Sequence, residues 1–310
     1  MKDKIRGGRT IFRYLLLIPA LIALFGKAVR AQEMEPRAYS RAPVGTQTVI
    51  LTYAHQSGDV FTDSALPLTD VSVSLNSFSL GYARTLGLAG RQMNVGVFVP
   101  YVFGKVNGTV FEERREVSRS GLGDIRIRVT QMLTGSPALK AKEFASFKRK
   151  TLIGASLSVI IPTGQYDPRR LVNVGSNRWA FKPEIGISKP LGNWTFELAA
   201  GAWLFTPNNN FFDGNRREQK PLLSLQAHVS YTIRPRMWVA VGGTYFNGGR
   251  TIVNKVLNSD MQNNVRLGAT FSYPFGKNHS LKVTSFRGAT TRIGSNLTTI
   301  AVGWQYTWFK

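Results

Sequence analysis

The C-terminal stretch of the chain, residues 297–310, alternates strictly between two kinds of side chain. Successive side chains of a β-strand point to opposite faces, so an alternation with a period of two indicates a strand with two different faces. One face carries Ile300, Val302, Trp304, Tyr306 and Trp308, and the other carries Ala301, Gly303, Gln305 and Thr307. The stretch is therefore predicted to be a strand whose apolar face is rich in large aromatic residues.

The same alternation recurs along the chain and predicts about twelve strands in all. They are residues 45–56, 70–84, 92–105, 122–132, 151–161, 178–188, 194–205, 222–233, 237–246, 265–273, 280–286 and 297–310. In the second of these, the apolar positions change parity between Leu75 and Phe78, which predicts a bulge or bend near Asn76 and Ser77.

The connections between the predicted strands also alternate, between short turns and long polar loops. The short ones are 85–90, 189–193, 234–236 and 274–279, and the long ones are 57–69, 106–121, 162–177, 206–221 and 247–264. An up-and-down barrel of the outer membrane has this arrangement, with short turns facing the periplasm and long loops facing outside. One connection, 133–150, is long where a short one is expected, and its basic and aromatic residues suit either an amphipathic helix or a solvated loop.

Charged residues in the middle of predicted strands separate a barrel from a soluble sandwich. They are Arg126, Arg128, Lys182, Glu184, Glu197, Arg266 and Lys282. An apolar core would bury these charges at a high cost, whereas the polar lumen of a membrane barrel accommodates them. The predicted fold class is therefore all-β, an antiparallel up-and-down transmembrane β-barrel of about twelve strands.

The N-terminus predicts export. A basic region from Lys2 to Arg13 precedes an apolar segment at 14–25, and Ala31 ends a stretch suited to signal-peptide cleavage before Gln32. We expect three parts: a signal peptide at 1–31, a short periplasmic segment at 32–44, and the barrel at 45–310. The predicted location is the outer membrane of a Gram-negative cell. The predicted partners are membrane lipid, lipopolysaccharide, a small-molecule solute and, through residues 297–310, the barrel-assembly machinery, with no nucleic acid.

Several segments resemble a known family of outer-membrane proteins, described as the MetA pathway of phenol degradation. They are residues 120–124, 162–167, 177–184, 201–205 and 242–245, and the resemblance extends over about residues 44–310. The resemblance implies an outer-membrane β-barrel that transports phenolic or other hydrophobic aromatic compounds. It assigns no individual site residues.

Enzymatic chemistry has little support in the sequence. The chain has three histidines and no cysteine, and neither a nucleophile motif nor a metal-ligand spacing is present. His228 shares a predicted face with Ser224, Ser230 and Thr232, and is predicted to be a polar lumen residue rather than a catalytic base. We therefore predict a protein that is not an enzyme and that uses no cofactor and no metal.

The predicted pore-lining residues are Arg126, Arg128, Arg178, Lys182, Glu184, Glu197, His228 and Arg266. They either form a constriction that selects solutes or pair with one another, as in Arg126 or Arg128 with Asp124, Glu184 or Glu197, and only brace the barrel. The loop aromatics Phe205, Phe211 and Phe212 suit the outer interface girdle or an apolar mouth, and the girdle is favoured.

The predicted function is passive uptake of small aromatic or hydrophobic compounds through an outer-membrane channel. Two alternatives stay open at this point. One is a plugged structural barrel that binds lipopolysaccharide through basic loops, consistent with a net charge of +23. The other is a barrel enzyme that modifies lipid, with His228 involved.

Overall fold

The computed structural model describes residues 35–61, 68–110 and 113–310, so the predicted signal peptide lies outside the described residues. The strands are β1 (Thr46–Phe61), β2 (Leu68–Leu88), β3 (Arg91–Val110), β4 (Glu113–Leu122), β5 (Ile125–Thr134), β6 (Leu152–Ile161), β7 (Ala180–Leu191), β8 (Trp194–Phe205), β9 (Asn208–Phe211), β10 (Asn215–Gln219), β11 (Leu222–Arg234), β12 (Met237–Gly248), β13 (Thr251–Val253), β14 (Val256–Leu257), β15 (Gln262–Phe275), β16 (His279–Thr291) and β17 (Gly294–Phe309). The helices are α3 (Ala141–Ser146) and the 3₁₀ turn η1 (Phe212–Gly214).

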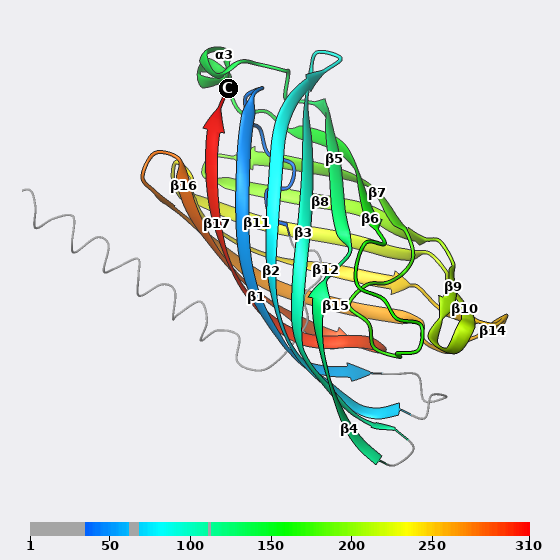
Figure 1. Cartoon of the computed structure of the whole chain (residues 1–310). Coiled ribbons are helices and arrows are strands. Elements are labelled where there is room, and N and C mark those ends of the chain that lie inside the picture. Colours follow the sequence, from blue (N-terminus) through cyan, green and yellow to red (C-terminus); the bar gives the residue numbers. More distant parts are fainter. Residues whose placement is uncertain (1–34, 62–67, 111–112) are drawn as a thin grey trace, which may run out of the picture.

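All of these strands except β9, β10, β13 and β14 form one closed antiparallel barrel (Figure 1). The first and last strands, β1 and β17, pair over their whole length, with Thr46 opposite Phe309 and Phe61 opposite Gly294, and this pairing closes the sheet. Since β4 and β5 both pair with β3 and together make one interrupted strand, the barrel has twelve strands, as predicted. Among the described residues no helix combines the length and the apolar character that a membrane-spanning helix needs.

The interruption between β4 and β5 lies opposite Pro100 of β3. A proline has no backbone N–H, so it cannot donate to the neighbouring strand. At this point the N–H of Gly123 donates a hydrogen bond to the carbonyl oxygen of Pro100, at 2.9 Å. The pairing with β3 continues on β4, from Leu122 opposite Tyr101 to Glu113 opposite Val110.

The two faces of the wall have the contrast that the alternation predicts. The outward face is apolar and exposed, with Leu51, Leu80, Ile185, Leu198 and Val241 among its members. The inward face buries polar and charged groups, including Lys182, Glu184, Glu197, Gln226, His228 and Arg266. A soluble protein would bury the first set and expose the second, so the wall is built for lipid outside and a polar lumen inside.

The bulge predicted near Asn76 and Ser77 is absent. The pairing of β2 with β1 runs without a register shift from Arg84, opposite Gln47, to Val71, opposite Val60. The apolar positions change parity for another reason: Phe78, Leu80 and Tyr82 face outward, whereas Val71, Val73 and Leu75 lie on the inward face of the same regular strand. An apolar stretch of lumen wall explains the parity change.

Three other boundaries differ from the prediction. Most of the predicted loops 57–69 and 106–121 belong to strands, because β1 to β4 continue beyond the length needed to cross the bilayer. Arg178 precedes β7 instead of lying within it. The connection 133–150 contains the short helix α3, so it is neither a plain loop nor a long amphipathic helix.

The two ends of the barrel are built differently (Figure 1). One end carries the C-terminus, α3 and the short turns, and by the turn-length rule it faces the periplasm. The other end carries the long loops, in which β14, β13, β10 and β9 form a small separate sheet. We refer to these as the periplasmic end and the loop end.

Candidate functional site

Residues 35–44, which we call the plug, lie against the inward face of the barrel before β1 begins. Glu35 is the first residue of the plug. Its carboxylate accepts one hydrogen bond from Arg126 Nη2 at 2.9 Å and one from Arg128 Nη1 at 2.8 Å. Burial by itself would raise the pKa of Glu35, but the charges of Arg126, Arg128 and Lys282 outweigh it and lower the pKa to about 2. Glu35 is therefore ionised at neutral pH and fixed between two guanidinium groups.

The second anchor of the plug is Arg37. Its backbone N–H donates to Glu197 Oε2 at 2.6 Å, while its guanidinium donates to Ser230 Oγ at 3.1 Å and to Thr232 Oγ1 at 2.6 Å. The same guanidinium lies 4.7 Å from the centre of the Trp238 ring. Burial lowers the pKa of Arg37 to about 10, although Glu197 opposes this, so the side chain keeps its charge at neutral pH.

The third anchor is Tyr39, which fits a slot made by two glycines. Its hydroxyl donates to Glu184 Oε1 at 2.9 Å and lies 3.3 Å from Ser156 Oγ. Its ring lies over Gly154 and Gly186, which face each other on β6 and β7. A β-carbon at Gly154 would come within 2.7 Å of the ring, and one at Gly186 would be closer still. The wall therefore has room for this ring only because both positions are glycine.

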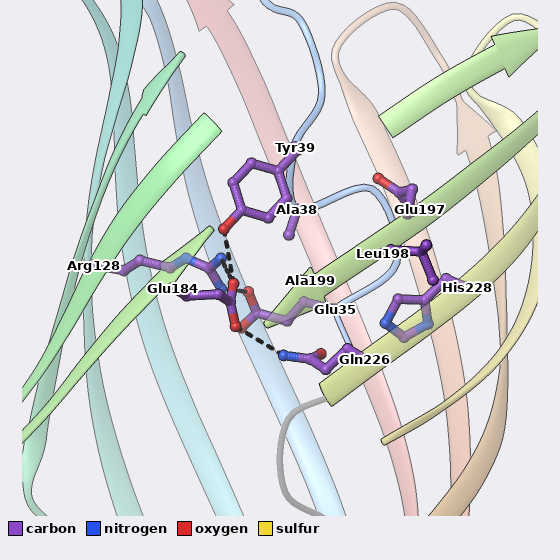
Figure 2. A pocket seen from close by; sticks show the side chains of 10 residues that line it. All are labelled: Glu35, Ala38, Tyr39, Arg128, Glu184, Glu197, Leu198, Ala199, Gln226 and His228. Atoms are coloured by element: carbon purple, nitrogen blue, oxygen red, sulfur yellow. Dashed lines mark hydrogen bonds and ion pairs between the residues drawn. The ribbon is translucent and has the colours of Figure 1, made fainter. Parts of the chain in front are cut away.

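Glu184 is the centre of the polar network beneath the plug (Figure 2). Besides Tyr39, its carboxylate contacts Lys182 Nζ at 2.6 Å, Arg128 Nη2 at 3.0 Å and Gln226 Nε2 at 3.0 Å. The side chains of Lys182 and Glu184 are each only 3% exposed. A carboxylate buried this deeply is stable only with such partners, since an unpaired charge in the same place would be strongly destabilising.

The plug leaves the lumen at the periplasmic end. The backbone N–H of Ala42 donates to Gln92 Oε1 at 3.0 Å, and that of Val44 donates to the carbonyl oxygen of Leu139 at 2.8 Å. The guanidinium of Arg41 lies 5.0 Å from the ring centre of Phe144, in α3. This differs from the predicted periplasmic segment, because the described part of that segment enters the lumen.

Little space remains where the plug meets the wall. The cavity between them has a volume of about 20 Å³, and Figure 2 shows its ten lining residues, among them Ala38, Tyr39, Glu184 and His228. This is room for about one water molecule. On this side of the lumen, the plug therefore obstructs the passage of solutes.

Six predicted pore-lining residues besides Glu184 lie on inward faces of strands, namely Arg126, Arg128, Lys182, Glu197, His228 and Arg266. His228 is opposite Glu197 in the pairing of β11 with β8, and its ring packs on Gly242 of the next strand. The Arg266 guanidinium lies 4.8 Å from the ring centre of Phe246. Arg178 lies apart from them near the loop end, where it donates to Gln219 Oε1 at 2.5 Å.

Of the internal ion pairs that the sequence suggested, the described residues contain Arg128 with Glu184. Asp124 serves another purpose: its carboxylate accepts from the N–H groups of Gly164 and Ser176, so it ties together a loop. The main partner of Arg126 and Arg128 is Glu35 of the plug, which the sequence analysis missed. A signal for it exists, because Glu35, Arg37, Tyr39 and Arg41 alternate with smaller residues in the manner of a segment with one polar face.

A second part of the lumen is apolar. Toward the loop end, the strand registers place the following residues on the inward face of β1, β2, β3, β16 and β17: Val60, Val71, Val73, Leu75, Val102, Val106, Phe286 and Leu297. Across the lumen, Ala180, Trp203, Leu222 and Phe246 form a buried apolar cluster, against which Phe205 packs. The predicted place of Phe205 in the outer girdle is therefore wrong, since its pairing with Ala180 turns it inward.

The comparisons with known proteins agree with this architecture. The model of the family described as “Putative MetA-pathway of phenol degradation” matches residues 54–298. A search of curated proteins found no match. The COG4313 outer membrane channel from Pseudomonas putida F1 has a similar structure, with a TM-score of 0.74 and 20% identity, covering 89% of this chain and 100% of that one. The β domain of the Bordetella autotransporter BrkA is also similar, with a TM-score of 0.52 and 14% identity over 85% of this chain and 100% of that one. At these identities the likenesses establish the fold.

Proposed function

Since this chain belongs to the family of the MetA pathway of phenol degradation, we propose that it is a passive outer-membrane channel for small aromatic or hydrophobic compounds of the phenol type. The observation that carries the proposal is the apolar inward face toward the loop end, formed by β1, β2, β3, β16 and β17. We call this face the open wall. It contrasts with the hydrogen-bonded face under the plug.

An apolar wall inside a barrel is unfavourable unless something apolar covers it. Each square ångström of apolar surface left in water costs about 25 cal/mol. Val73, Leu75 and Val102 lie on the open wall and are only partly buried. A small aromatic solute that enters from the loop end would cover such side chains and remove water from both surfaces, and pockets for small ligands are lined in this way.

The plug is the specific observation in favour of the alternative, a closed barrel with a structural role. It fills the polar part of the lumen and leaves room there for about one water molecule. None of the hydrogen bonds that we observe from residues 35–39 reaches the open wall; their partners lie on β5, β6, β7, β8 and β11. The plug therefore restrains the passage of polar solutes and is compatible with a path for apolar ones.

An enzymatic role for His228 has no support from its surroundings. Both nitrogens of its ring are buried and have no hydrogen-bond partner among the described residues. A catalytic base must reach the proton that it removes, through a hydrogen bond or a single water. His228 is therefore best understood as a packed lumen residue.

The test is the uptake of labelled phenol at micromolar concentration by cells that make the full chain in an outer membrane depleted of general porins. We expect initial uptake about 5-fold above that of cells with an empty vector, because the open wall offers an apolar path through the membrane. Glucose uptake is the control and should stay at the vector level, because the plug obstructs polar solutes. Phenol uptake at the vector level, with the barrel folded and present in the outer membrane, would favour the closed structural barrel.

A further inference from the structure

Glu35 occupies its place in the lumen in the manner of a bound ligand. We infer that Arg126 and Arg128 form a carboxylate-binding subsite, that Glu35 fills it as an internal competitor, and that the solutes able to displace it are aromatic carboxylates. This inference rests on the proposed channel function and adds a second class of aromatic solute, the carboxylates, at the plug. It concerns the polar half of the lumen, whereas the uptake of neutral aromatics depends on the open wall.

The geometry is that of a two-point carboxylate clamp. The two arginines stand two residues apart on the inward face of β5, and each donates to a different oxygen of the same carboxylate. Planar guanidinium groups recognise the two oxygens of a carboxylate with particular specificity. A phenol offers a single oxygen and is uncharged at neutral pH, like the tyrosine side chain, so it can replace neither the second contact nor the charge of Glu35.

The two guanidinium groups are held in place by the barrel wall as well as by Glu35. Arg128 Nη2 also donates to Glu184 Oε1 and to Ser156 Oγ. Arg126 lies over the ring of Phe98, 5.1 Å from its centre. Because these contacts involve strand residues only, the clamp keeps its shape when the carboxylate is exchanged.

The charge balance favours an exchange of carboxylates over simple withdrawal of the plug. Glu35 lies in the field of three cations, Arg126, Arg128 and Lys282. If the plug withdrew with nothing in its place, Glu184 would remain as the carboxylate bound to Arg128, and Arg126 would lose its observed ion-pair partner. The Arg126 side chain is 29% exposed, so losing this partner costs part of the penalty of unpairing a fully buried charge. A solute carboxylate restores the balance, so it lowers the cost of moving the plug.

The surroundings of the clamp suit an aromatic ring. The ring of Phe98 lies flat over Gly81 and Gly96, where a β-carbon would come within 2.7 Å and 3.2 Å of it. Phe98 and Val102 share the inward face of β3, and Leu75 lies on the same face of β2. A carboxylate held by Arg126 would therefore have apolar side chains on the loop-end side to receive its ring, as aromatic contacts prefer.

The experiment uses a thiol reporter on the plug. The chain has no cysteine, so Ala38→Cys places a single thiol beside the cavity, between Glu35 and Tyr39. The rate of its reaction with a membrane-impermeant maleimide is measured on the full mature protein in lipid vesicles, with added benzoate, benzamide or acetate. We expect benzoate to raise the rate about 10-fold, because it displaces Glu35 and exposes the plug, while benzamide and acetate change it less than about 2-fold.

Two background variants complete the test. In Glu35→Gln the clamp has lost its charged occupant, so labelling should be fast without any solute and benzoate should add little. In the matched control Glu113→Gln, which changes an exposed glutamate of β4, the response to benzoate should be that of the parent. If inorganic phosphate accelerated labelling as much as benzoate, the assignment to aromatic carboxylates would be overturned. If benzamide accelerated it as much as benzoate, the negative charge of the solute would not be what displaces Glu35.

The result can be separated from the fate of the proposed function. If no solute changes the labelling rate while cells still take up phenol, the clamp is a structural contact and the channel proposal stands. If benzoate displaces the plug but phenol uptake stays at the vector level, the subsite exists and the route for neutral aromatics does not.

Discussion

The two sides of the lumen differ in chemistry: one is charged and hydrogen-bonded, and the other is apolar. The side under the plug, made by β5, β6, β7, β8 and β11, carries charges such as Lys182 and Glu184, which are bonded to each other, and several of its polar groups bind the plug. The open wall carries apolar side chains such as Val73, Leu75 and Val102, which need no partners. One side is therefore filled, and the other can be left free.

This difference teaches why a plug need not make a barrel inert. Buried charges need partners, and the plug supplies the carboxylate of Glu35 to Arg126 and Arg128 and the backbone N–H of Arg37 to the carboxylate of Glu197. Apolar groups need no partner. Their contact with water is unfavourable, and a hydrophobic solute that covers them removes this cost. The filled side thus holds the plug, while the open wall is the surface along which we propose that apolar solutes pass.

The largest expected effect comes from breaking the filled side at the glycine slot. In Gly186→Leu, the new side chain takes the place of the Tyr39 ring, since even a β-carbon there would clash with it. We expect the plug to leave the wall and the single-channel conductance in planar bilayers to rise about 5-fold, because overpacking forces the neighbouring group to move.

Two variants control this prediction. Ile187→Leu changes the adjacent outward position, and its conductance should equal that of the parent. Adding Tyr39→Ala to Gly186→Leu removes the ring that collides and should bring the conductance back toward the parent, which is the coupling expected of residues in contact. A folded Gly186→Leu protein with unchanged conductance would show that the plug does not control ion flow.

A smaller effect is expected from placing a charge on the open wall. In Val102→Asp, a solute crossing this surface must strip water from a carboxylate, and a cost of about 0.7 kcal/mol would lower the phenol uptake above the vector level about 3-fold while leaving conductance near that of the parent. Val102→Leu keeps the wall apolar and should keep uptake within about 2-fold. Equal uptake by the Asp and Leu variants would mean that phenol does not pass along β3.

The smallest effect on conductance is expected from lowering the pH. Because the pKa of Glu35 is lowered to about 2, its ion pairs are complete above the ordinary glutamate pKa and are lost as the pH falls through the lowered value. Conductance should therefore stay constant from about pH 8 to pH 4, and at about pH 3 only about a tenth of the molecules should have a protonated Glu35. Half-release of the plug near pH 4.5, seen as a rise in conductance, would contradict the strength assigned to the clamp.

The sequence predicted the barrel well, because the alternation of faces is a local property. The aromatic strand β17 and the inward charges Arg126, Lys182 and Glu184 are where the alternation placed them. The parity change in β2 is real, but the bulge predicted from it is not. The pattern of a single strand cannot show whether its apolar residues face lipid or an apolar lumen. Phe205 was misplaced for the same reason.

The period of two determined by itself that this chain forms strands with a lipid face and a lumen face, because side-chain direction follows from the backbone of each strand. Only the tertiary structure decided that residues 35–44 enter the lumen. The contact of Arg37 with Glu197 joins residues 160 positions apart, and the slot for Tyr39 needs Gly154 and Gly186 on neighbouring strands. Closure of the barrel brings these groups together, and so decides which lumen charges are paired with the plug and which wall is left open.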